Sequence, residues 1–323
     1  MVLQEFPDIA WLKNQIDQGF GNKLGWGNLP LDTEGFPSVI IHTRSEECFR
    51  PDIKGPLSLF LNIRGNSLCK VDGVTRQVGQ DTYFISNRNQ PYTLQIERGK
   101  PTGTFNSGAT ETFNIHFGEY FAESVLNALV TPADSILEKG RQQDVSIFQF
   151  FNQLHRRDDH FNSVINRILQ AQEENGFDRL LFEQQLTHLL GYLLQQQRDV
   201  SKAVDKLPPV RMSTRVELYR RLSRSVDYIH ANVGEKIDLE DLSAASLLSK
   251  YHFLRLFKLA YGRSPYQYIQ DLRIEKARGI LSKTTLPVAD LAYSLGFDNP
   301  QSFSRLFFQR LGLYPTHYRE KTK

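Results

Sequence analysis

The pattern of apolar and polar residues divides the chain into a strand-rich first part and a helical remainder. Between residues 38 and 117, short runs of β-branched and aromatic residues alternate with turn residues, as is typical of β-strands. The predicted strands are 38–43, 57–63, 67–71, 81–86, 92–97 and 112–117. The pair Asp72 and Gly73 favours a tight hairpin turn. These runs predict an antiparallel barrel or sandwich, whose closure leaves a lumen.

After Gly118 the apolar residues recur at the period of an α-helix. The predicted helical segments are 121–129, 146–155, 160–173 and 179–197. The last segment carries a broad apolar stripe, formed by Leu180, Leu181, Leu186, Leu189, Leu190, Leu193 and Leu194. The stripe either packs the helix onto its own sheet or also pairs with the same helix of a second subunit. Both interpretations stay open.

A polar segment around Pro208 and Pro209 marks a boundary, because proline cannot continue a helix. We predict a first domain over 1–200, a linker over 201–216 and a second domain over 217–323. The chain has 323 residues, which agrees with two domains. Ser213 or Thr214 is expected to cap a helix that runs toward Asn232.

The two predicted domains differ in charge. Residues 201–323 hold 21 basic and 12 acidic residues, a net charge of +9. The first 200 residues hold 18 basic and 24 acidic residues, a net charge of −6. A basic surface is often only solvated, but the asymmetry also fits a polyanionic partner of the second domain.

Targeting signals and paired cysteines are both missing from the pattern. The first residues lack a basic region followed by an apolar stretch, and no run of about 18 apolar residues occurs, so we expect a cytoplasmic protein. Cys48 and Cys69 lie in strand-like segments without a paired spacing. They are predicted to be buried free thiols, not parts of a disulfide or a zinc site.

An internal repeat with a shift of 50 residues lies in the second domain. Each copy follows a short amphipathic helix, at 239–242 and at 288–291. The shift superposes Phe253 on Phe303, Arg255 on Arg305, Leu256 on Leu306, Phe257 on Phe307, Gly262 on Gly312, Pro265 on Pro315 and Tyr268 on Tyr318. A helix, its C-cap and its exit turn therefore recur together, which indicates two copies of one structural unit.

The residues between the paired helices fit a helix-turn-helix motif. In the second copy Gly296 lies at the turn, Asn299 is the expected N-cap and Pro300 takes the first helical position. In the first copy Ser249 is the expected cap, and Leu247 takes the turn position, which requires a somewhat different turn.

The second helix of each copy has a buried and an exposed face by its 3.6-residue period. The predicted buried residues are Phe253, Leu256, Phe257 and Ala260 in the first copy and Phe303, Leu306, Phe307 and Leu311 in the second. The predicted exposed residues are Lys250, Tyr251, Leu254, Arg255 and Lys258, and Gln301, Ser302, Arg305 and Gln309. Singly, each is most simply a solvated side chain; as two matching faces they indicate a binding surface.

These residue types suit the edges of base pairs. Arginine can donate twice to guanine, glutamine can pair with adenine, and tyrosine or leucine can contact the thymine methyl group. Lys250, Lys258 and Arg310 suit phosphates better. Residues 266–281 form one predicted helix of about 24 Å, long enough to hold two recognition helices one groove repeat apart.

On these residues the chain resembles the AraC-type transcription regulators. The resemblance covers about 226–319 and includes Leu272-Arg-Ile-Glu-Lys-Ala277, Val288-Ala-Asp-Leu-Ala-Tyr-Ser-Leu-Gly-Phe297, Phe303-Ser-Arg-Leu-Phe307 and Gly312-Leu-Tyr-Pro-Thr-His-Tyr-Arg319. It implies base contacts by Tyr251, Leu254, Arg255, Gln301, Ser302 and Arg305. Leu254 departs from the polar residue often found at its position.

The resemblance also implies the fold class and the partners. The expected fold is α+β, with an N-terminal cupin-like β-barrel or sandwich with helices and a C-terminal all-α double helix-turn-helix domain. The expected partners are double-stranded promoter DNA, a small-molecule effector in the N-terminal domain and a second copy of the chain in a homodimer. RNA polymerase is a further partner, and no membrane is expected.

Enzymatic and metal chemistry find little support. His42 and His116 lie far apart, whereas a metal-binding cupin needs clustered ligands. The segment 155–160 contains metal-ligand types, two histidines and two aspartates, which we interpret as solvated charge at a helix junction. We predict no catalysis, no metal and no cofactor. Open alternatives are a cupin-like binding or enzymatic domain with a helical protein-interaction module, and a protein or lipid-like partner of the N-terminal domain.

Overall fold

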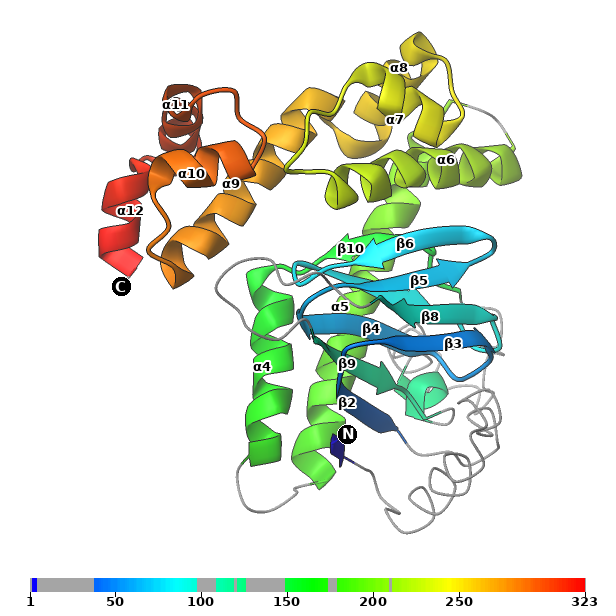
Figure 1. The fold of residues 1–323 in the computed structure, drawn as a ribbon. Helices are drawn as coiled ribbons and strands as arrows, with labels where there is room; N and C mark the ends of the chain where they lie inside the picture. The colour runs from blue at the N-terminus through cyan, green and yellow to red at the C-terminus, as the bar shows by residue number, and fades with distance from the viewer. Residues whose placement is uncertain are drawn as a thin grey trace, which may run out of the picture. The chain divides into compact units, whose positions relative to one another are not determined.

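The computed structural model describes residues 2–4, 38–97, 109–118, 121–125, 149–173, 179–208 and 211–322 (Figure 1). The chain forms two compact units, Met1–Val200 and Ser201–Lys323. Of the sequence predictions, Pro209, residues 126–129 of the helix predicted over 121–129 and residues 146–148 of the helix predicted over 146–155 lie outside the described residues.

The first unit contains two antiparallel sheets, so the predicted β-rich architecture is confirmed. The six-stranded sheet has the order β1 (Val2–Gln4), β2 (Val39–Ser45), β9 (Thr110–His116), β4 (Ser58–Arg64), β7 (Thr82–Ser86) and β10 (Leu154–Arg156). The four-stranded sheet has the order β3 (Cys48–Ile53), β8 (Tyr92–Ile96), β5 (Ser67–Val71) and β6 (Val74–Val78). All six predicted strands form, and the short strands β1, β3, β6 and β10 are additional.

The turn between β5 and β6 is the predicted tight hairpin. Asp72 and Gly73 both have positive φ, 51° and 75°. A two-residue turn in which both residues have positive φ matches the right-handed twist of the flanking strands. The Asp-Gly pair therefore set the register in which Val71 lies opposite Val74.

The two faces of β4 contact different layers of the unit. Leu59 and Leu61 belong to a core shared with the helices, whereas Phe60 points the other way and joins a core between the two sheets. The core between the sheets consists of Ile41, Ile53, Phe60, Cys69, Val71, Val78, Phe84, Tyr92 and Leu154. This core lies between the two sheets, at the place of the predicted lumen.

Helices α4 (Asp159–Glu173) and α5 (Arg179–Asp205) cover the six-stranded sheet. The leucines of the α5 stripe are at most 3% exposed at Leu186, Leu189, Leu190, Leu193 and Leu194, where they pack on the unit's own sheet. The own-sheet interpretation is therefore confirmed for these five, whereas Leu180 and Leu181 are 77% and 42% exposed, and pairing of the stripe with a second subunit stays a prediction.

Two sequence predictions, the helix over 146–155 and the linker over 201–216, differ from the structure. Segment 146–155 is not helical in its described part, because Leu154 and His155 pair with Phe84 and Tyr83 in the sheet. The apolar spacing of this segment fits a helix, but residues 154–156 form a strand that pairs with β7. Segment 201–216 is largely helical, since α5 continues to Asp205 and α6 begins at Met212.

The residues that extend α5 explain its length. Val200, Ala203 and Val204 keep a helical apolar spacing and are buried, so polar neighbours do not end the helix. The N-cap of α6 is Arg211, with Ser213 and Thr214 already inside the first turn, so the predicted cap is wrong.

The second unit is helical. Its helices are α6 (Met212–Ala231), α7 (Leu239–Ser246), α8 (Lys250–Tyr261), α9 (Pro265–Lys283), α10 (Val288–Ser294), α11 (Pro300–Leu311) and α12 (Pro315–Thr322). Helix α9 runs from one half of the unit into the other (Figure 1). Its last part shares a core with α10, α11 and α12, which includes Ile274, Ala277, Leu281, Leu291, Phe303 and Phe307. None of the described helices is long and apolar enough to cross a membrane.

Candidate nucleic-acid interface

The internal repeat of the sequence is also a repeat in space. Gly262 and Gly312 end α8 and α11 in the left-handed conformation, with φ of 70° and 73°. Proline then opens the next helix in both copies. The ring of Tyr268 meets Phe257 edge to face at 5.7 Å, and Tyr318 meets Phe307 in the same way at 5.5 Å.

The first helix-turn-helix motif consists of α7 and α8. A capping box between Asp238 and Asp241 opens α7, with Asp238 accepting from the Asp241 N–H at 2.9 Å. Leu247 makes the turn at φ 52°, the left-handed conformation. The predicted turn position is therefore confirmed, and Leu247 adopts the conformation in spite of its side chain. Ser249 is the N-cap of α8 as predicted, without a side-chain cap hydrogen bond among the described residues.

The second motif consists of α10 and α11. Gly296 makes the turn at φ 73°. Asn299 caps α11 by accepting from the Ser302 N–H at 2.8 Å, and Pro300 is the first helical residue. All three predictions for this motif are confirmed.

Both second helices turn their predicted apolar faces inward. Phe253, Leu256, Phe257 and Ala260 are all buried in α8. In α11, Phe303 and Phe307 are buried, whereas Leu306 and Leu311 are only partly buried at the edge of the same core. The predicted periodicity is therefore confirmed, with a shallower core under α11.

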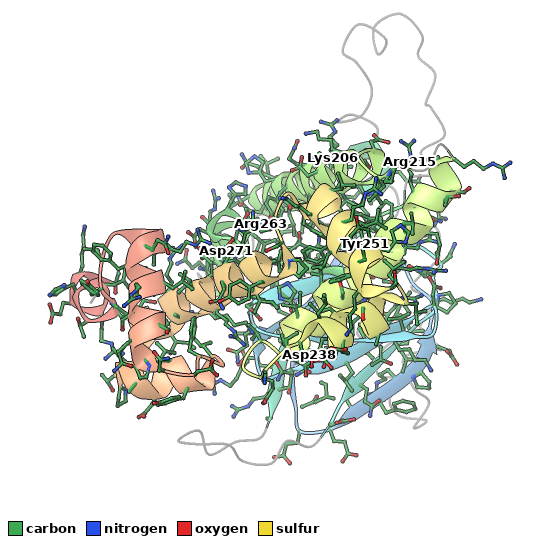
Figure 2. All side chains as sticks on the ribbon, turned by 90° about the horizontal axis from the view of Figure 1, so that it is seen from above. Lys206, Arg215, Asp238, Tyr251, Arg263 and Asp271 are labelled. Carbon is green, nitrogen blue, oxygen red and sulfur yellow. The ribbon has the colours of Figure 1, made fainter. Side chains whose placement is uncertain are left out.

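The predicted base-contact residues are exposed in both copies. They are Tyr251, Leu254, Arg255, Gln301, Ser302 and Arg305. Tyr251 is 79% exposed (Figure 2). Leu254 is 39% exposed. Arg255 and Arg305 occupy equivalent positions in the two copies. Each copy therefore exposes one guanidinium group, which can donate two hydrogen bonds to a base, next to side chains that differ between the copies.

The predicted phosphate-contact residues differ in their surroundings. Lys258 is exposed, and it forms no ion pair with any described residue. Lys250 forms an ion pair with Glu240 at the start of α7. Arg310 forms an ion pair with Asp271 at 2.9 Å, and Arg263 contacts the same carboxylate at 2.7 Å (Figure 2). Two of the three cations thus already have a partner.

The sequence patterns give no indication of Asp271 as a contact of both copies. Arg263 follows the C-cap of α8 and Arg310 lies in the last turn of α11, so one carboxylate on α9 reaches the ends of both second helices. Both arginines are about half exposed, at 49% and 41%, so each pair on its own contributes little to stability.

Two histidines of the first unit, His116 and His155, are buried. Burial lowers the pKa of His116 to about 4, and Ser58 lies 2.8 Å from its Nδ1. His155, predicted to be solvated, is instead buried and stacked on Tyr83 at 5.1 Å. Within the described ranges no group of three His, Cys, Asp or Glu could hold a metal ion.

The cysteines partly follow prediction. Both are free thiols, and Cys69 is buried while Cys48 is only half-buried. Burial raises the pKa of Cys69 to about 12, which leaves its thiol protonated and unreactive at neutral pH.

The second unit is similar to the helix-turn-helix domains of known transcription regulators. A family model described as a helix-turn-helix domain matches residues 242–321. The chain is 34% identical over 98 residues to the HTH-type transcriptional activator AarP of Providencia stuartii, covering 30% of this chain and 73% of AarP. It is 31% identical over 152 residues to the MmsAB operon regulatory protein of Pseudomonas aeruginosa, covering 46% of this chain and 48% of that protein.

The chain is also similar to solved structures, with low TM-scores. The DNA-binding domain of AdpA, solved with a target DNA, is 28% identical with a TM-score of 0.31, covering 31% of this chain and 91% of that one. Fatty-acid-bound ToxT of Vibrio cholerae is 11% identical with a TM-score of 0.35, covering 89% of this chain and 96% of that one. The chain spans 48% and 34% of the first two curated relatives that it matches.

Proposed function

Since the chain belongs to the AraC family of transcription regulators, we propose that it binds duplex promoter DNA sequence-specifically through α8 and α11. In this proposal, residues 217–323 form the DNA-binding domain and each second helix enters a major groove. Two grooves on one side of the duplex are then read by a single chain.

One observation carries the proposal: two copies of the same motif expose equivalent faces. Arg255 and Arg305 lie at equivalent positions, each after a buried phenylalanine that fixes the helix on its core. An isolated exposed arginine needs no function, but two at matched positions of repeated motifs in a domain of net charge +9 fit a polyanionic partner.

In this proposal the exposed faces of α8 and α11 make different contacts with DNA. In the first copy Tyr251, Leu254 and Arg255 contact bases, and Lys250 and Lys258 contact phosphates. In the second copy Gln301, Ser302 and Arg305 contact bases, and Arg310 contacts a phosphate. Arginine favours guanine by two hydrogen bonds, and Tyr251 and Leu254 favour a thymine methyl group.

The test is selection of bound duplexes from a random library by the full chain, at one fixed salt concentration. We expect a site with two short boxes about one helical turn apart. Arg255→Ala should relax one box and Arg305→Ala the other, each by roughly 1–3 kcal/mol of base discrimination.

Gly279→Ala serves as a matched control, because Gly279 lies on α9 outside both exposed faces and a Cβ there meets nothing within 4 Å. Unchanged selectivity in both arginine variants would contradict the assignment. It would favour the alternative in which the helical unit binds proteins.

We propose further that the first unit is regulatory and not catalytic. It carries a net charge of −6, which disfavours DNA. In this proposal it binds a small-molecule effector and joins two chains into a homodimer, and RNA polymerase is the further partner. In α5 the buried leucines pack on the unit's own sheet, whereas Leu180 and Leu181 are 77% and 42% exposed, so the part of the stripe that can contact a second chain is the start of the helix.

Sedimentation of the full chain tests the homodimer. Operator affinity, measured across a panel of small molecules, tests the effector. A strictly monomeric chain, or a panel without any effect on operator affinity, would contradict the respective part of the proposal.

A further inference from the structure

Arg273, in the middle of α9, joins the two halves of the second unit. Its guanidinium donates from Nε to the Val233 carbonyl at 3.0 Å, from Nη2 to the Glu235 carbonyl at 2.7 Å and from Nη1 to the Gly296 carbonyl at 2.8 Å. Val233 and Glu235 follow α6 in the first half, and Gly296 is the turn of the second motif. One side chain thus holds the backbone of both halves.

The charge of Arg273 suits this place. The carbonyls lie just beyond the C-terminal ends of α6 and α10, where helix dipoles leave partial negative charge. The residue is 7% exposed, and burial lowers its pKa from the ordinary value. Only arginine offers three donors in a planar fork, so lysine cannot reach all three acceptors.

Two glycines bring the same two loops into direct contact. A Cβ on Gly234 would lie 2.7 Å from the Ser294 carbonyl oxygen. A Cβ on Gly296 would lie 2.5 Å from Nη2 of Arg273 and 2.9 Å from the Gly234 carbonyl oxygen. The backbones therefore touch at a distance that no other residue type allows without displacement.

Aromatic side chains connect Arg273 to α11. The Arg273 guanidinium lies 5.5 Å from the ring centre of Phe297, and Phe297 meets Phe303 edge to face at 5.2 Å. Phe303 is fully buried on the inner face of α11. On the opposite side of α9, Asp271 binds Arg263 and Arg310. Movement of one half relative to the other would break contacts on both sides of α9.

We propose that Arg273, Gly234 and Gly296 form a rigid joint that fixes the spacing of the two DNA boxes read by α8 and α11. Arg273 is then a positioning residue: it sets where the two reading helices lie relative to each other and touches no base. This inference rests on the proposed function, since it presupposes that both helices read DNA.

The test measures affinity of the full chain for the selected site and for versions with one to three base pairs inserted or removed between the boxes. The variants are Arg273→Lys, which keeps the charge, and Gly234→Ala, which keeps the charge and adds one methyl group against Ser294. Gly279→Ala is the matched control, because a Cβ at this position of α9 meets nothing within 4 Å. Helix content by circular dichroism checks each fold.

For the wild type and Gly279→Ala we expect affinity to fall about tenfold or more with two inserted base pairs, as for a lost base contact. For Arg273→Lys and Gly234→Ala we expect a flatter profile, within about threefold across the series, while base preference inside each box is retained.

Two other outcomes would overturn the inference, and they are distinguishable. If the variants lose affinity equally at every spacing and keep the wild-type profile, Arg273 supports the fold only and the joint is wrong. If the wild type selects no two-box site, the proposed function itself is wrong, and the joint is overturned with it.

Discussion

The two helix-turn-helix motifs make the same turn with different residues. Leu247 and Gly296 both adopt the left-handed conformation, at φ 52° and 73°. Leu247 is 64% exposed, so its side chain points into solvent and only the backbone is strained. A side chain on Gly296 would collide with Arg273 and Gly234. The left-handed turn thus tolerates a side chain where space is open, and contact between the halves makes glycine necessary in the second motif.

The starts of α8 and α11 differ in a similar way. Asn299 caps α11 through a hydrogen bond, whereas Ser249 takes the N-cap of α8 without one among the described residues. The reading faces differ too, because Tyr251 corresponds to Gln301 and Lys258 to Phe308. The backbone is repeated, but its local supports and its surface chemistry are not.

The largest difference between the copies should appear at the turn. We expect Gly296→Ala to lower the free energy of unfolding of the second unit by about 2–4 kcal/mol, from left-handed strain together with displaced hydrogen bonds of Arg273. Leu247→Gly should change it by less than about 1 kcal/mol, because relief of strain opposes the entropy of glycine in the unfolded chain. Urea unfolding followed by circular dichroism measures both.

Gly312→Ala separates the two contributions to the loss. Gly312 has the same φ of 73°, but a Cβ there meets nothing within 4 Å. It should therefore cost only the strain, about 1–2 kcal/mol. Equal losses for Gly296→Ala and Gly312→Ala would mean that the contact with Arg273 adds nothing.

A smaller difference is expected at the N-caps. Asn299→Ala removes a cap hydrogen bond and should cost about 1 kcal/mol. Ser249→Ala removes no such bond in the described structure and should cost a few tenths of that at most. Thermal unfolding of the two variants under the same conditions measures the difference, and a larger loss for Ser249→Ala would reverse the comparison.

The repeat explains why the sequence predicted the second unit in detail. Its caps, turns and buried phenylalanines are local features, and each occurs twice, so Gly262, Pro265 and Tyr268 could be checked against Gly312, Pro315 and Tyr318. Local rules of capping and periodicity therefore determine most of the motif.

Features that depend on distant contacts were not predictable in this way. Leu154 pairs with Phe84, 70 positions earlier, and this pairing outweighs the helical spacing of its own segment. Arg273 likewise has an unremarkable place in α9, and only the fold brings it to the carbonyls of two distant loops. The predicted base contacts stay predictions, because exposure shows that a side chain is accessible and not what it binds.

The smallest expected effect concerns the cations of the first copy. Lys258 forms no ion pair among the described residues, so Lys258→Ala should reduce the slope of log affinity against log salt by about 0.9. Lys250 is already paired with Glu240, and it must exchange this partner for a phosphate, so Lys250→Ala should reduce the slope less. Glu240→Gln sharpens the test: it should raise affinity at low salt by freeing Lys250. Binding of the selected duplex at several salt concentrations measures all three slopes. Equal slope changes for the two lysine variants, without an effect of Glu240→Gln, would mean that the ion pair with Glu240 does not limit the contact of Lys250 with DNA.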